Sequence, residues 1–300
     1  MSTLSQQPEP PINLLRGWPN STLLPTTLIK HAATAVLSNP QVAQEALAYG
    51  PDPGWEPARI AIAQWLTESY APPSPIAPDR LCITGGASQN LGSLLGVYTD
   101  PAYTRTVWIV APAYFLAFRI FEDAGFGGKM RAVPEDGEGL DIAFLEREVR
   151  KSEEEQRVNV SEPVYKPQRT RAKVYRHVVY CVPSFANPSS RTMSLRRREQ
   201  LVRLARRHDM LLVADDVYDF LQWPVAEKGS GLDSDSGPRQ EFLPRLVDVD
   251  RDIDGGAERE GADGFGNACS NGSFSKIAGP GVRCGWVEGT KKLAYGASQT

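Results

Sequence analysis

The chain has 300 residues, of which 41% are hydrophobic and 23% are charged, and its formal net charge is −3. These values describe a globular protein that can bury a substantial core, and the slight negative charge gives no general attraction to nucleic acid or anionic membranes. The three histidines, His31, His177 and His208, lack the spacing of metal ligands, so the sequence predicts no metal site.

Short apolar strands alternate with helices along most of the chain. Helical spacing of apolar residues predicts helices over residues 27–38, 56–70 and 194–207, and helices that begin near Ser88 and Tyr114. Apolar runs predict strands over residues 81–84, 107–110, 177–182 and 211–214. Because these strands are apolar on both faces, the pattern predicts a mostly parallel sheet with helices on both sides, which is a three-layer α/β/α domain.

Two stretches interrupt this alternation. Residues 150–173 are charged with mixed sign, and residues 225–270 are rich in glycine, serine and aspartate with few aromatic residues. Both compositions are typical of solvated, flexible insertions. Within the second stretch, the apolar residues 242–247 predict one short strand.

The cysteines and the N-terminus indicate a compartment. Cys82 and Cys181 lie in apolar, strand-like runs, and we interpret them as buried free thiols of a protein in a reducing environment. The N-terminus lacks the basic and apolar regions of a signal peptide, and no apolar run is long enough to span a bilayer. The expected location is the cytoplasm.

The most informative stretch runs Ser273-Phe274-Ser275-Lys276 and is followed by a Gly-Pro-Gly turn and Arg283. On its own, it is typical of a surface turn, because an isolated lysine is usually a solvated charge. The alternative is a site for a phosphorylated aldehyde, in which Lys276 forms a Schiff base while serine and Arg283 bind the phosphate. Lysine reacts only when deprotonated, and a nearby cation such as Arg283 lowers its pKa.

Further candidate residues follow other predicted strands, and ligands of open parallel sheets collect at the carboxyl ends of the strands. Gly85 and Gly86 join a strand to a helix, which is typical of an ordinary turn and also of a phosphate-binding helix N-terminus. Tyr114 follows the strand that ends at Val110, and such a tyrosine either packs in the core or stacks on a flat cofactor.

Polar residues that could bind an aromatic ring follow the next two strands. Asn187 precedes a proline, where asparagine usually starts a turn, but its amide could also bind a ring hydroxyl. Asp215 ends the apolar run from Leu211, and a buried carboxylate is costly unless it meets a cation such as a protonated pyridine nitrogen. Tyr218 could reach the phenolate oxygen of the same ring. A helix cap followed by an incidental tyrosine is the alternative.

Taken together, these residues resemble the class I/II aminotransferases of pyridoxal-phosphate fold type I, and within them the aminoadipate/kynurenine-type branch. The similarity runs from about Ile12 to the end of the chain. Three motifs carry it: Asn187-Pro188-Ser189-Ser190, which stands for the family's Asn-Pro-Thr-Gly, Asp215-Asp216-Val217-Tyr218, and Ser273-x-Ser275-Lys276 with Arg283.

The resemblance implies pyridoxal 5′-phosphate as the cofactor, and Lys276, Asp215 and Tyr218 as the catalytic residues. Lys276 would form the Schiff base and move the proton, and Asp215 would keep the pyridine nitrogen protonated. Asn187 and Tyr218 would bind the ring oxygen, and Asn187 would also contact the substrate, while Tyr114 would stack on the ring. The phosphate would be held by the backbone of Ala87 and by Ser88, Ser273 and Arg283.

The resemblance also implies an assembly and a domain organisation. Tyr49 matches a tyrosine that the family contributes to the phosphate site of the partner subunit, which implies a homodimer. Gly17 matches a segment that lines the substrate pocket. Residues 1–40 would form an N-terminal segment of the small domain and substrate lid, and residues 41–300 would form the cofactor-binding large domain.

The sequence departs from the family pattern at three places. Ser189-Ser190 replaces Thr-Gly, which changes a turn, and Ala87 stands where a hydroxyl is often found, so that one phosphate hydrogen bond is lost. Family members continue beyond the position of Thr300 into a small domain whose arginine binds the substrate carboxylate. We therefore expect most of the small domain to be missing, with Arg16 as a weak substitute for that arginine.

Three functions fit the sequence. The first is a transaminase acting on an amino acid and a 2-oxo acid. The second is an elimination enzyme such as a C–S lyase, because the same cofactor chemistry can expel a β-substituent. The third is a truncated, inactive binding or dimerisation protein. The sequence does not fix the identity of the substrate.

Overall fold

The computed structural model describes residues 19–155, 162–167, 169–222 and 242–300. Within these ranges the strands form one sheet in the order β1-β8-β7-β6-β5-β2-β3-β4. The strands are β1 (Leu81–Thr84), β2 (Thr106–Ala111), β3 (Met130–Asp136), β4 (Gly139–Leu140), β5 (His177–Cys181), β6 (Met210–Asp215), β7 (Ala268–Ser273) and β8 (Gly285–Glu288).

The centre of the sheet is parallel and its margins are not. Within the run β3-β2-β5-β6-β7, each strand is parallel to the next. Strand β8 lies antiparallel between β1 and β7, and β4 is antiparallel to β3. The prediction of a mostly parallel sheet is confirmed, and each of the four predicted strands coincides with an observed one to within one residue at each end.

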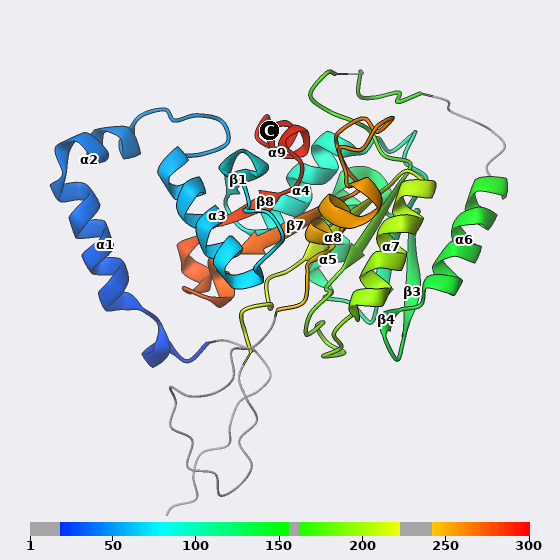
Figure 1. Cartoon of the computed structure of the whole chain (residues 1–300), viewed down its shortest axis with the longest axis horizontal. Coiled ribbons are helices and arrows are strands. Elements are labelled where there is room, and N and C mark those ends of the chain that lie inside the picture. The colour runs from blue at the N-terminus through cyan, green and yellow to red at the C-terminus, as the bar shows by residue number, and fades with distance from the viewer. Residues whose placement is uncertain (1–18, 156–161, 168, 223–241) are drawn as a thin grey trace, which may run out of the picture.

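Helices cover both faces of the sheet, as Figure 1 shows. The helices are α1 (Thr26–Ser38), α2 (Pro40–Leu47), α3 (Glu56–Tyr70), α4 (Ala87–Tyr98), α5 (Leu116–Phe121), α6 (Ile142–Glu155), α7 (Leu195–Arg207), α8 (Leu246–Asp252) and α9 (Lys291–Ala297). In the part of the chain that the structure describes, no helix has both the length and the apolar character needed to cross a membrane.

The two faces of the sheet carry separate hydrophobic cores, because successive strand side chains point to opposite faces. Ile109 and Val178 belong to the core that includes buried residues of α4, α5 and α9. Their neighbours Val110 and Val179 belong to the core that includes residues of α6, α7 and α8. These two cores make the three-layer α/β/α arrangement that the apolar runs predict.

The first two helices differ from the rest because none of their residues is buried. In Figure 1, α1 and α2 stand beside the body of the molecule, and α3 lies between them and the sheet. Leu28, Leu37 and Leu47 on these helices are 70%, 61% and 81% exposed. Apolar exposure of this kind usually marks a surface that contacts another chain or domain.

The predicted solvated insertion over residues 225–270 is wrong for its second half. Helix α8 packs through Leu246 and Val249 into the same core as α7. Residues 223–241 lie outside the described residues. The predicted strand over residues 242–247 is also wrong, since α8 begins at Leu246 and the residues before it form no strand.

A buried ion cluster explains how so polar a segment joins the core. Arg245 is 1% exposed, and its guanidinium donates to Asp248 Oδ2 at 2.9 Å and to Glu288 Oε2 at 2.6 Å. The guanidinium also lies 4.3 Å from the ring centroid of Tyr70. Two carboxylates and a ring face compensate the cost of burying the cation. Composition alone does not reveal the two distant partners, Tyr70 of α3 and Glu288 of β8.

Candidate active site

A cavity of about 850 Å³ lies beyond the carboxyl ends of β5, β6 and β7, where open parallel sheets bind ligands. Nine of the residues that the sequence singles out line it together: Ala87, Ser88, Tyr114, Asn187, Asp215, Tyr218, Ser273, Lys276 and Arg283. They come from segments that are far apart in the chain, and the strand order brings them together. The residues just after Gly17, from Pro19 to Pro25, also contribute to its wall.

Asp215 ends β6 and lies at the inner side of the cavity. Its Oδ2 accepts a hydrogen bond from the Tyr180 hydroxyl at 2.7 Å, whereas its Oδ1 is buried without a partner among the described residues. Desolvation raises the pKa of Asp215 to about 6, against the opposing effects of the Tyr180 hydrogen bond and the charge of Lys276. The oxygen without a partner, Oδ1, can accept a hydrogen bond from an N–H group of a bound ligand.

Lys276 lines the same cavity. It closes the short 3₁₀ turn Phe274–Lys276 directly after β7, and its side chain is exposed. Its Nζ lies 5.8 Å from the ring centroid of Tyr218, whose hydroxyl accepts a hydrogen bond from Asn187 Nδ2 at 3.3 Å. An amine, a phenol and an amide therefore surround the space next to Asp215.

An anion cradle forms where α4 begins. Gly86 has a φ of 106°, and a Cβ placed there would lie 3.3 Å from Arg283 Nη2 and 3.5 Å from Ser273 Oγ. Arg283 itself has a φ of 49°, and its Nη2 donates to the Gly85 carbonyl at 3.1 Å while its Nη1 donates to Ser275 Oγ at 3.3 Å. A helix N-terminus, two serine hydroxyls and a guanidinium converge, which is the chemistry that binds a phosphate.

Two asparagines that the sequence reasoning missed hold this cradle on the sheet. Asn90 is fully buried in α4, and its Nδ2 donates to Asn271 Oδ1 at 2.7 Å and to the Trp286 carbonyl at 3.0 Å. Asn271 Nδ2 donates in turn to the Ala87 carbonyl at 3.1 Å. A polar residue inside a buried helix face is the signal that could have identified Asn90. Tyr180 was missed because it reads as one more aromatic residue in an apolar strand.

One predicted site residue within the described ranges is not at this cavity. Tyr49 follows α2 and is fully exposed, and it does not line the cavity. Its assignment to a partner subunit's site stays a prediction. Gly17 lies outside the described residues.

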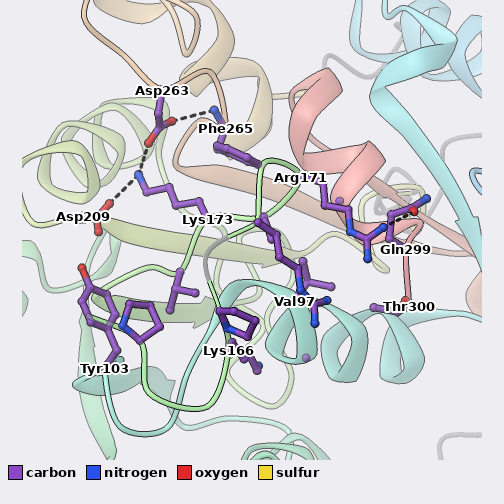
Figure 2. Close-up of a pocket in the computed structure, with 17 residues that line it drawn as sticks. Val97, Tyr103, Lys166, Arg171, Lys173, Asp209, Asp263, Phe265, Gln299 and Thr300 are labelled. Carbon is purple, nitrogen blue, oxygen red and sulfur yellow. Dashed lines mark hydrogen bonds and ion pairs between the residues drawn. The ribbon is translucent and has the colours of Figure 1, made fainter. Parts of the chain in front are cut away.

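A second cavity, of about 480 Å³, lies beside the segments that lead into β5 and β6 (Figure 2). Two of its basic residues have side-chain partners: Lys173 Nζ lies 2.7 Å from Asp209 Oδ1 and 2.7 Å from Asp263 Oδ2, and Arg171 donates to Gln299 Oε1 at 2.9 Å. None of the predicted site residues lines it. The larger cavity is therefore the candidate active site.

Comparison with known proteins places the chain among enzymes. The model of the family described as aminotransferase class I and II matches residues 20–299. An uncharacterized protein of Saccharomyces cerevisiae is 36% identical over 293 residues, covering 92% of this chain and 63% of the relative. Aromatic-amino-acid aminotransferase 1 of Thermococcus litoralis is 28% identical over 276 residues, covering 92% of this chain and 54% of the relative.

Solved structures show the same fold. The multiple substrate aminotransferase of Thermococcus profundus has a TM-score of 0.66 at 25% identity and covers 94% of this chain and 57% of that one. An archaeal alanine:glyoxylate aminotransferase has a TM-score of 0.67 at 23% identity, with coverage of 94% and 56%. The chain thus spans between about half and two thirds of the length of these proteins. The extent of the family match shows that the chain belongs to the class I and II aminotransferases.

Proposed function

We propose that the protein is a pyridoxal-phosphate-dependent transaminase that transfers an amino group between an amino acid and a 2-oxo acid. The observation that carries this proposal is the unpartnered Oδ1 of Asp215, which lies in one cavity with Lys276 and the anion cradle. A protonated ring nitrogen would fit Asp215 Oδ1, an aldehyde carbon would fit Lys276, and a phosphate would fit the anion cradle. The donor set therefore fits the cofactor at each of its polar groups.

The residues of the chain have separate tasks in this reaction. When bound, pyridoxal phosphate supplies an electron sink that stabilises negative charge at the substrate's Cα. Asp215 holds the proton at the ring nitrogen, and Asn187 and Tyr218 bind the ring hydroxyl. Lys276 Nζ takes the proton from the substrate's Cα and delivers it to another carbon on the same face of the bound substrate and cofactor. Arg283 and the start of α4 hold the phosphate.

The walls of the cavity support a preference for apolar amino acids. Nine leucine, isoleucine and valine side chains line it: Leu23, Leu24, Leu91, Leu116, Ile120, Val182, Val217, Leu221 and Ile277. Lys276 and Arg283 are its only basic residues within the described ranges, and both are engaged by the cofactor in this proposal. No described cation therefore remains to bind a side-chain carboxylate of a dicarboxylic substrate.

The assembly and location form part of the same proposal. The exposed apolar residues of α1 and α2, and the fully exposed Tyr49, support a homodimer in which these surfaces are covered. Cys82, Cys181 and Cys269 are buried and unpaired, which supports a reducing compartment such as the cytoplasm.

A single-turnover assay tests the reaction and its substrate class. Protein loaded with pyridoxal phosphate and mixed with phenylalanine should release one 2-oxo acid per bound cofactor and no ammonia. Phenylalanine should react at least about tenfold faster than aspartate, since an unpaired carboxylate in an apolar pocket costs more than 1 kcal/mol. Continuous release of ammonia without an amino acceptor would instead indicate elimination, and no reaction with any amino acid would indicate an inactive protein.

Arg283→Ala tests the assignment of the phosphate end. We expect the Kd for pyridoxal phosphate to rise between about tenfold and a hundredfold, because hydrogen bonds to charged groups contribute about 1.5–3 kcal/mol. The Kd for pyridoxal, which lacks the phosphate, should not change. Arg131→Ala, which removes an exposed arginine elsewhere on the surface, is the matched control. An equal loss for both ligands would contradict the assignment.

A further inference from the structure

Tyr180 occupies a position from which a strand side chain can reach Asp215. It lies on β5 and pairs with Val213 of β6, two residues before Asp215. Side chains two residues apart in a strand share a face, and an aromatic side chain can reach its diagonal neighbour on the adjacent strand. The Tyr180 ring is 2% exposed and packs edge-on against Phe121, with ring centroids 5.8 Å apart. This packing fixes where the hydroxyl points.

The hydroxyl distinguishes the two oxygens of Asp215. It donates to Oδ2 at 2.7 Å, while Oδ1 is buried and has no hydrogen-bond partner in the described residues. A carboxylate held by one hydrogen bond cannot rotate freely, so the open oxygen is held in one direction. Asp215 and Tyr180 both line the cavity, so this orientation is set at the site itself.

We propose that Tyr180 is a positioning residue that binds Asp215 Oδ2 and thereby reserves Oδ1 for the protonated ring nitrogen of pyridoxal phosphate. The inference rests on the proposed function. Tyr180 acts through Asp215, and it also favours the ionised form of that carboxylate, which is the form that can hold a ring proton.

The buried surroundings of Tyr180 keep its hydroxyl protonated, so that it can always donate a hydrogen bond to Asp215. Burial raises the pKa of Tyr180 well above its usual value, so its hydroxyl keeps its proton over the neutral pH range. The other titratable groups that face Asp215 are Asp219, whose charge raises the pKa of Asp215, and Lys276, whose charge lowers it, together with Tyr218 and Cys181. Tyr180, unlike these four groups, donates a hydrogen bond to the carboxylate of Asp215 in the described residues.

Tyr180→Phe removes the hydroxyl and keeps the ring. In the cofactor-free protein we expect the pKa of Asp215, followed by carbon-13 NMR of its carboxyl group, to rise by about one unit. Because the ring proton is held by the ionised carboxylate, the Kd for pyridoxal phosphate should rise by about twofold at pH 7 and by about tenfold at pH 5, below both pKa values. With an analogue that has carbon in place of the ring nitrogen, the difference between the two proteins should disappear.

Tyr175→Phe is the matched control, since Tyr175 is also fully buried and donates to the Gly266 carbonyl at 2.5 Å rather than to Asp215. It should change neither quantity. An unchanged pKa of Asp215 in Tyr180→Phe would overturn the proposal. Failure of the unaltered protein to bind pyridoxal phosphate would overturn the proposed function instead, because the NMR titration needs no cofactor.

A second measurement does not depend on whether the variant folds. In the unaltered protein the hydroxyl proton of Tyr180 should exchange slowly with water, and its resonance should shift with the titration of Asp215, whose pKa is about 6. A hydroxyl proton that exchanges rapidly, or that does not respond to this titration, would equally overturn the role of Tyr180.

Discussion

Replacing Lys276 with alanine is expected to abolish covalent retention of the cofactor and nearly all turnover. Lys276 is the only lysine that lines the cavity within the described residues, and Tyr218 is the ring beside it. Proton transfer by a positioned side chain contributes about 10²–10⁴-fold to a rate, and we expect a loss of kcat near the upper end of this range. After borohydride reduction, mass spectrometry should detect bound cofactor on the unaltered protein and none on the variant.

Lys291→Ala is the matched control for this experiment. Lys291 has a 60% exposed side chain and pairs with Asp79 at 2.7 Å, away from the cavity. It should retain both the adduct and the activity. A reduced adduct that persists in Lys276→Ala would show that another amine binds the cofactor.

Asp215→Asn should weaken cofactor binding and stabilise the cofactor-free protein at neutral and higher pH. The pKa of Asp215 is about 6 in the folded protein, mainly through desolvation, and about 3.9 in an unfolded chain. Between these values the folded state binds more protons than the unfolded state, so stability falls as pH rises from about 4 to about 6 and remains lower above it. Asparagine does not titrate, so the variant does not lose this stability as the pH rises.

The variant's advantage in the free energy of unfolding should therefore grow by about 2 kcal/mol between about pH 4 and about pH 8. Urea unfolding of both cofactor-free proteins across this range measures the difference. Asp123→Asn, on an exposed residue, should show no such trend. A constant difference at every pH would mean that Asp215 is not held with a raised pKa.

The sequence predicts the parallel centre of the sheet because β2, β5 and β6 are buried on both faces and are almost entirely apolar. Strand β7 is buried at every position as well, yet it reads Ala-Cys-Ser-Asn-Gly-Ser. Its polar groups are satisfied by distant partners: Ser270 Oγ donates to Asp216 at 2.5 Å, and Asn271 pairs with Asn90 of α4. Local composition gives no sign of these partners, so the strand was not predicted.

The residues of the candidate site likewise fall into those that could be predicted from the sequence and those that could not. Lys276, Asp215, Asn187 and Arg283 could be predicted, because their chemistry depends on residue type at a strand end or turn. The supporting residues Asn90 and Tyr180 could not, because their roles depend on which strands become neighbours. The contributions of Tyr49 and Gly17 stay predictions that need the assembled protein.

The position of β8 between β1 and β7 has a consequence for folding. Arg283, just before β8, hydrogen-bonds Gly85, just after β1, across 198 residues of sequence. The anion cradle therefore does not exist on a growing polypeptide until β8 has been synthesised and inserted. A ligand that binds only the folded state stabilises that state by mass action. Bound cofactor should therefore stabilise those chains in which the contact between Arg283 and Gly85 has formed. Loading with cofactor would then report completion of folding, not merely the presence of the lysine.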